Sequence, residues 1–327
     1  MTRRISRRTA LGAMAGTLAA LRAPAIFAAE EKLRVGKAVV ENIGFLPLNI
    51  GMEAGIFQRN GLAIEELTFA GGAKIAQAMA ADAVDISLSG GPDMAFVAKG
   101  APEIAVGSIS ESPSFMAFCV GAQSTAKTMD DLKGKRLGIT SAGSLTAWLV
   151  DELNRVKGWS GDDRAVKVTV GGATSSELAA LKTGEVDATI VSRQVGFLVE
   201  EQQVGRFLFD ASAYVGPIEM NTIFAHTALA EKNPDAVRRF LKAWYETIAY
   251  MKAHKDETVE IGAKVMGDPP IVVSRAYDTL IAKFSNDGKF APTALETLRN
   301  SFVALKSIDG PIDMSKLYTE KYLPTAA

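Results

Sequence analysis

Residues 71–88 read GGAKIAQAMAADAVDISL, and residues 171–190 read GGATSSELAALKTGEVDATI. Both stretches open with two glycines, continue with a helical pattern, and end with Val-Asp followed by a short apolar segment. The second copy is two residues longer between the glycines and the Val-Asp pair. A Gly-Gly loop that opens a helix, with an apolar strand after it, is typical of a βαβ unit. The repeat therefore predicts two lobes of similar design.

Short apolar runs and helical patterns alternate around both copies, which indicates an α/β fold. The expected strands are 33–40, 63–69, 84–88 and 103–109 in the first set, and 136–140, 166–170 and 188–191 in the second. The expected helices are 45–58, 73–81, 92–99, 144–157 and 174–183.

After about residue 225 the pattern is helical only, with helices expected at 234–254, 257–265, 272–284 and 292–305. Helices without intervening strands extend neither sheet, so we expect them to pack on the first lobe. The expected division is 30–119 and 222–327 for lobe 1 and 120–221 for lobe 2. The chain would cross between the lobes near 117–121 and 220–225, and two crossings form a hinge.

The composition excludes several classes of protein. The chain has 327 residues, 36 Lys and Arg against 37 Asp and Glu, 48% hydrophobic residues and one cysteine. The balanced charge argues against a nucleic-acid binder, and the single cysteine excludes a disulfide scaffold. The hydrophobic content argues against a disordered chain. Cys119 lies in an apolar run and is expected to be a small buried hydrophobe.

The first 29 residues read as an export signal that is removed from the working protein. They hold five arginines and no acidic residue, and removing them changes the net charge from −1 to −6. An apolar run from Leu11 to Leu21 follows the basic start, and small residues follow that run. The pair Arg7-Arg8 resembles a twin-arginine signal; an ordinary secretory signal is the alternative. Both predict a mature protein in the periplasm.

The sequence resembles the periplasmic substrate-binding proteins of ABC importers in the nitrate, sulfonate and taurine group (NitT/TauT, SsuA-like). The motifs that carry the resemblance span nearly all of the mature chain and read EAGIFQRNGL at 53–62, GG at 71–72, AVDI at 83–86, DLKGKRLG at 131–138 and GEVDA at 184–188. The resemblance implies a two-lobed type II periplasmic-binding-protein fold. It also implies a protein that closes over a small molecule and delivers it to a permease.

Small hydroxylated loops with glycines follow one predicted strand in each lobe. Ser89 and Gly90 follow the strand at 84–88, and Ser141, Gly143 and Ser144 follow the strand at 136–140. In open α/β sheets ligands bind beyond the carboxyl ends of strands, where helix N-termini present backbone N–H groups. One such loop alone is more commonly a capped helix start, whereas matching loops on both lobes favour a binding cleft. Other candidates in the same position are Asn42, Phe45, Gly72, Gly172, Thr174 and Ser192.

The family resemblance implies an anionic ligand held by hydroxyls and backbone N–H groups. Arg193 follows the strand at 188–191 and would suit a carboxylate if it faced the cleft; alternatively it begins a surface helix. Glu219 and Asn221 lie at the predicted return crossing, where family members place a ligand-facing polar group; solvated hinge surface is the alternative. Phe45 is alternatively part of an apolar helix face.

The expected partners are a small-molecule ligand and an ABC permease in the inner membrane, with the protein a monomer that binds no nucleic acid, metal or cofactor. Two other functions stay open: a small enzyme on the same scaffold acting on a pyrimidine-like ligand, and a ligand sensor for a membrane receptor. His226 and His254 belong to no His/Cys cluster, and no catalytic motif is present, so an enzyme is not expected.

Overall fold

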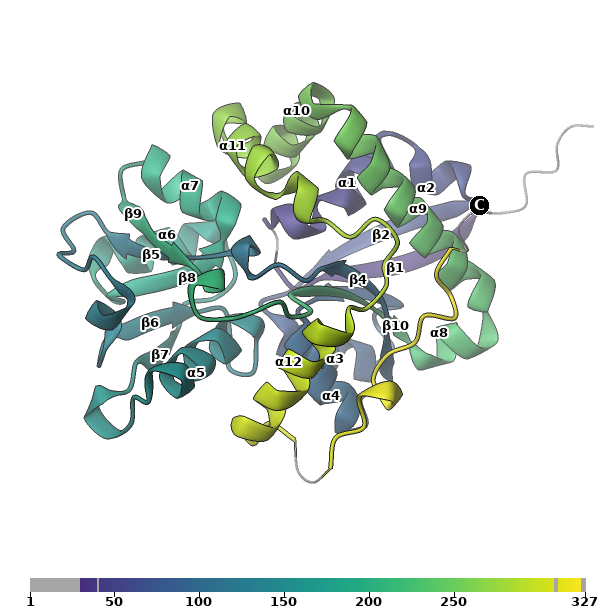
Figure 1. The fold of residues 1–327 in the computed structure, drawn as a ribbon. Helices are drawn as coiled ribbons and strands as arrows, with labels where there is room; N and C mark the ends of the chain where they lie inside the picture. The colour runs from purple at the N-terminus through teal and green to yellow at the C-terminus, as the bar shows by residue number, and fades with distance from the viewer. Residues whose placement is uncertain (1–29, 40, 309–310, 325–327) are drawn as a thin grey trace, which may run out of the picture.

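The computed structural model describes residues 30–39, 41–308 and 311–324. In this part of the chain, two five-stranded sheets lie beside each other with helices packed around them (Figure 1). The first sheet has the order β2 (Leu62–Thr68), β1 (Glu31–Lys37), β3 (Ile86–Ser89), β10 (Asn221–His226) and β4 (Glu103–Ser110). The second has the order β7 (Val166–Thr169), β6 (Arg136–Ile139), β8 (Ala188–Ser192), β5 (Met116–Gly121) and β9 (Gly205–Asp210). We call each sheet with its helices a lobe.

The helices divide unequally between the lobes. The first lobe carries α1 (Leu46–Glu53), α2 (Ile56–Arg59), α3 (Gly72–Ala80), α4 (Met94–Ala98), α8 (Thr227–Lys232), α9 (Pro234–Ala253), α10 (Lys255–Met266), α11 (Pro270–Leu280) and α12 (Pro292–Ala304). The second lobe carries α5 (Leu145–Lys157), α6 (Thr174–Thr183) and α7 (Arg193–Glu201). The predicted two-lobed α/β fold, with the last helices on the first lobe, is confirmed (Figure 1). None of the described helices is long and apolar enough to cross a membrane.

The two sheets share one topology. In the first, β1 runs parallel to β2 and β3, and β10 pairs antiparallel with β3 and β4. In the second, β6 runs parallel to β7 and β8, and β5 pairs antiparallel with β8 and β9. Each sheet therefore receives its antiparallel strand from the segment of chain that has just crossed from the other lobe.

One charged pair recurs at the same place in both lobes. The backbone N–H of Arg34 and that of Arg136 each donate to an aspartate 51 residues later, Asp85 and Asp187, over 2.8 Å. Each guanidinium also bonds to the same aspartate and to a backbone carbonyl 48 residues later. The aspartate of the repeated Val-Asp motif thus links the turn before β3 to β1 in the first lobe, and the turn before β8 to β6 in the second. This shared contact supports the predicted duplication.

The crossings lie earlier than predicted. Residues 111–115 and 211–220 join the two sheets, because β5 belongs wholly to the second sheet and β10 wholly to the first. The expected boundaries at 119/120 and 221/222 fall inside these strands and are wrong. Both strands are buried on both faces, so their sequences lack the alternation that marks a half-exposed strand. The predicted export signal lies outside the described residues.

The predicted helix at 45–58 is interrupted, because Gly55 takes a left-handed backbone conformation with φ of 66° between α1 and α2. The break lets α2 pack against α9, where the rings of Phe57 and Phe240 lie 5.4 Å apart and Trp244 stacks on Phe240. All three rings are fully buried, and burial of each contributes roughly 2 to 3 kcal/mol to folding. This packing fixes the C-terminal helices on the first lobe.

Candidate functional site

A cavity, here called the cleft, lies between the lobes. The first lobe contributes Ala38, Val39, Glu41, Asn42, Phe45, Gly71, Gly72, Ser89, Gly90 and Asn221. The second contributes Met116, Thr140, Ser144, Leu145, Thr146, Gly172, Glu177, Ile190, Val191 and Ser192. Most of these residues follow β1, β2, β3, β6, β7 or β8, whose carboxyl ends meet where the lobes face each other.

Glycines allow the lobes to approach closely. A Cβ atom at Gly90 would lie 2.9 Å from the Cβ of Leu145 in the other lobe, and one at Gly172 would lie 3.2 Å from Cγ1 of Val39. A side chain at Gly71 would collide with the Ser141 hydroxyl. The Gly-Gly loops therefore permit contact between lobes as well as opening helices.

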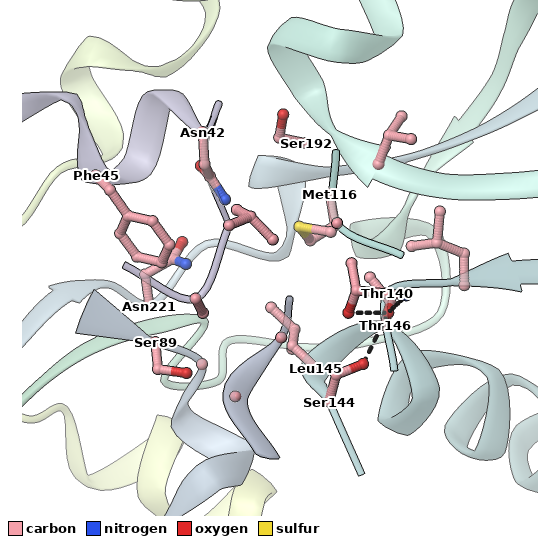
Figure 2. A pocket seen from close by; sticks show the side chains of 18 of the residues that line it. Asn42, Phe45, Ser89, Met116, Thr140, Ser144, Leu145, Thr146, Ser192 and Asn221 are labelled. Atoms are coloured by element: carbon pink, nitrogen blue, oxygen red, sulfur yellow. Dashed lines mark hydrogen bonds between the residues drawn. The ribbon is translucent and has the colours of Figure 1, made fainter. Parts of the chain in front are cut away.

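On the second lobe, hydroxyl groups form a connected chain (Figure 2). The Ser144 hydroxyl donates to the Ser141 carbonyl over 2.7 Å and caps α5 by accepting from the N–H of Ala147. Thr146 Oγ1 lies 2.9 Å from Ser144 Oγ and 3.1 Å from Thr140 Oγ1. The backbone N–H of Thr140 also donates to Thr146 Oγ1. These bonds hold the loop after β6 rigidly against the cleft.

Opposite them, Asn42, Phe45, Ser89 and Asn221 face the cleft from the first lobe (Figure 2). Asn42 Oδ1 accepts from the backbone N–H of Gly44 over 2.7 Å, which caps a single 3-10 turn and sets the Phe45 ring at the cleft. The Ser89 hydroxyl donates to the buried carboxylate of Asp93. The cleft also has an apolar side, formed by Phe45, Met116, Leu145, Ile190 and Val191.

The charge of the cleft is acidic. Glu41 and Glu177 line it from opposite lobes, and none of its lining residues within the described part of the chain is Lys, Arg or His. Burial, together with the nearby Glu41 carboxylate, raises the pKa of Glu177 to about 8. Asp268, in the loop before α11, has its pKa raised to about 6 by burial and also by Glu41. Glu41 therefore acts on a carboxyl of the second lobe, Glu177, and on one of its own lobe, Asp268.

Four polar contacts join the lobes around the cleft. Thr174 at the start of α6 donates to Glu41, and the Trp148 indole N–H of α5 donates to the Ser301 hydroxyl of α12 over 2.7 Å. Arg275 of α11 pairs with Glu200 of α7 over 2.8 Å, and the Gln194 amide donates to Asp268. The structure is thus a closed arrangement of the two lobes.

Nine of the predicted candidates line the cleft: Asn42, Phe45, Gly72, Ser89, Gly90, Ser144, Gly172, Ser192 and Asn221. Ser141 supports the hydroxyl chain through its carbonyl oxygen, and Thr174 contacts Glu41. Gly143 is exposed and lies beside a separate cavity with Phe96 and Trp148.

Arg193 and Glu219 are not among the residues that line the cleft. The Arg193 guanidinium lies 3.7 Å from the centre of the Phe207 ring and 4.5 Å from that of Phe197, because α7 directs its first side chain toward β9. The expectation of a cleft arginine is therefore not met. Glu219 is fully buried in the segment that leads into β10, rather than on a solvated hinge surface.

Sequence reasoning omitted several lining residues from the site. Thr140 and Thr146 flank the predicted loop from Ser141 to Ser144, and Glu41 directly precedes Asn42. Their closeness in sequence to predicted site residues could have identified them. Glu177 lies in the first turn of α6, where a glutamate side chain is usually exposed to solvent. Met116 was missed because the crossing was placed after it.

Comparison with protein families matches residues 42–258 to the NMT1/THI5-like family. The chain belongs to this family. A Haemophilus influenzae relative named for thiamine biosynthesis is 28% identical over 234 residues, which cover 70% of this chain and 72% of the relative. A Bacillus subtilis relative named as an aliphatic sulfonates-binding protein is 26% identical over 288 residues, which cover 86% and 84%.

Solved structures share the fold. The alkanesulfonate-binding protein SsuA of Xanthomonas axonopodis, bound to MOPS, superimposes with a TM-score of 0.72 at 19% identity and covers 85% of this chain and 94% of that chain. The predicted resemblance to periplasmic binding proteins of ABC importers is confirmed at the level of family and fold.

Proposed function

We propose that this protein is the solute-binding component of an ABC importer, which captures a small organic molecule by hinge closure and delivers it to an inner-membrane permease. The observation that carries the proposal is the cleft itself, lined in similar measure by two lobes that segments 111–115 and 211–220 join. The names of the relatives, binding proteins among them, support the same function.

Hinge closure fits the way the lobes meet. Each lobe has its own sheet, and the contacts between lobes around the cleft include hydrogen bonds and one ion pair. Rotation about the two joining segments breaks these contacts without disturbing either sheet. A ligand that touches both lobes binds the closed form better than the open form and so shifts the population toward it.

The proposed place of action is the periplasm, with residues 1–29 acting as a twin-arginine export signal. The basic, acid-free start and the pair Arg7-Arg8 support this. Replacing Arg7 and Arg8 with Lys is expected to block export. Unchanged export would leave the general secretory route, and an exported protein that retains Met1 would contradict cleavage.

The test of binding is release of a bound compound. The exported protein is purified, unfolded in denaturant, and the released small molecules are identified by mass spectrometry. We expect one compound in near-stoichiometric amount that rebinds unchanged after refolding. Chemical conversion of that compound by the refolded protein would favour an enzyme instead.

A further inference from the structure

The hydroxyl protons of the second lobe point along their own chain and away from a ligand. A hydroxyl has one proton to donate and two lone pairs to accept with. Ser144 uses its proton on the Ser141 carbonyl, which only accepts. Thr146 must then be the donor toward Ser144, and Thr140 the donor toward Thr146. A ligand beside Thr140 therefore meets a lone pair.

Two more hydroxyl groups that line the cleft also donate their protons within the protein. Ser192 lies 3.3 Å from the Gln194 Oε1 atom and donates to it, because the Gln194 amide nitrogen donates to Asp268. Ser89 donates to Asp93, whose pKa burial raises to about 7, so this direction holds above that pH. Of the serines and threonines that resemble an anion site, Ser89, Ser144 and Ser192 thus present acceptors, whereas the Ser141 hydroxyl has no partner in the described part of the chain.

The remaining polar atoms at the cleft are also mainly acceptors. Glu177 is only 6% exposed, and no described residue donates a hydrogen bond to its carboxylate. The Oδ1 atom of Asn221 is buried at the cleft without a partner in the described part of the chain. Asn42, whose Oδ1 atom is used by Gly44, and Asn221 are the lining amides that keep N–H donors for the cleft in the described part of the chain.

The start of α3, a potential anion site, already has a carboxylate beside it. A Cβ atom at Gly72 would collide with both carboxylate oxygens of Asp93. Asp93 is buried, and its charge would repel a second anion placed at this helix N-terminus.

Closure itself brings like charges together. Glu41 and Asp268 belong to the first lobe and Glu177 to the second, and Glu41 acts on both of the other carboxyls. A cation between Glu41 and Glu177 removes this repulsion, whereas an anion adds to it. The closed form is therefore stabilised selectively by positive charge.

We propose that the cleft selects a small organic cation with N–H donors, an ammonium or an amidinium, held by Glu177 of one lobe and Glu41 of the other. The apolar side formed by Phe45, Met116 and Leu145 contacts its carbon skeleton. This inference rests on the proposed binding function and names the ligand class of the same site.

The test uses probes that share a shape and differ in charge. Benzamidinium, benzamide and benzoate form one set, and butylammonium and butanesulfonate form a second. Binding to the refolded, ligand-free protein is measured at pH 8 by thermal shift and calorimetry. We expect the cation of each set to bind at least tenfold more tightly than its anion. Glu177→Gln and Glu41→Gln should each weaken the cation at least tenfold, whereas the exposed Glu185→Gln should not.

The outcomes separate the two proposals. Equal or tighter binding of benzoate or butanesulfonate overturns the cation proposal and leaves the binding function standing. Absence of binding by every probe overturns the cation proposal, and it overturns the binding function as well if no compound is released from the purified protein. A cooperative melting transition of each variant without ligand shows that the variant is folded. If both Glu177→Gln and Glu41→Gln are folded and bind the cation with unchanged affinity, the cation proposal is overturned as well.

Discussion

The Thr174 hydroxyl of the second lobe donates a hydrogen bond of 2.9 Å to the Glu41 carboxylate of the first. The backbone N–H of Thr174 points at the same oxygen from 3.4 Å. Because α6 begins at Thr174, its N-terminus faces this negative charge, which is the favourable orientation. The contact exists only when the lobes are closed, so it couples Glu41 to closure.

Thr174→Val keeps the shape of the side chain and removes its hydroxyl. A hydrogen bond to a charged group contributes about 1.5 to 3 kcal/mol, so benzamidinium affinity should fall by roughly tenfold or more. Calorimetry measures the loss, and Thr174→Ser, which keeps the hydroxyl, should retain most of the affinity. Equal affinities of the Val and Ser variants would mean that the contact does not stabilise the closed form.

Affinity for a cation should depend on pH through Glu177. The pKa of its carboxyl is raised to about 8 in the closed form without ligand, and a cation needs the ionised form. Below pH 8, affinity for benzamidinium should fall by up to about tenfold per unit. Asp268, whose pKa is raised to about 6 in part by Glu41, adds a second negative charge near Glu41 above that pH, so the dependence should steepen near pH 6.

Calorimetry between pH 6 and 9 measures this dependence, and Glu177→Gln should flatten it above pH 7. A constant affinity across the range in the unsubstituted protein would place the cation elsewhere.

Glu219 should make the protein less stable as pH rises. Burial raises its pKa to about 8 in the folded protein, against an ordinary value of 4.5. Between these values the unfolded chain loses a proton that the folded chain keeps, so the free energy of unfolding falls with rising pH. Glu219→Gln should therefore add on the order of 3 kcal/mol at pH 8.5 and little at pH 4.5. Urea unfolding at both pH values measures this, and an equal effect at both would contradict it.

The two repeated Arg–Asp pairs should differ in energy because their exposure differs. The Asp85 side chain is 18% exposed and that of Asp187 37%. Asp85→Asn should lower the free energy of unfolding by about 1 to 3 kcal/mol, and Asp187→Asn by less than about 1 kcal/mol. The pKa of Asp85 is lowered by Arg34 bonds, so its contribution should vanish in acid. Urea titrations of both variants provide the comparison, and a larger effect of the Asp187 substitution would contradict this reasoning.

Local patterns predicted the parallel strands and most of the longer helices, because β1, β6 and α5 carry their periodicity in adjacent residues. The strands β5, β9 and β10 and the helix α7 were absent from the expected elements; β5 and β10 are buried on both faces and show no periodicity. The site was predicted where it follows strand ends, as at Ser89 and Ser144. The charge of the site was not predicted correctly, because packing on Phe207 decides the direction of the Arg193 side chain. The sequence pattern does not encode that contact.

Gly90→Val provides a way to hold the lobes apart without unfolding either one. The Gly90 backbone, at φ −86° and ψ 148°, is extended and suits valine. A valine Cβ would lie 2.9 Å from the Cβ of Leu145 in the closed form, so closure should be blocked. Ala122 is exposed and lies outside the cleft and outside both joining segments, so Ala122→Val supplies the control.

Closure over a ligand in the cleft is tested most directly by small-angle X-ray scattering with and without saturating benzamidinium at pH 8. The radius of gyration of the unsubstituted protein and of Ala122→Val should fall when ligand is added, while that of Gly90→Val should stay at the open value. An unchanged radius in the unsubstituted protein, with binding shown by calorimetry, or equal contraction of Gly90→Val, would contradict the account.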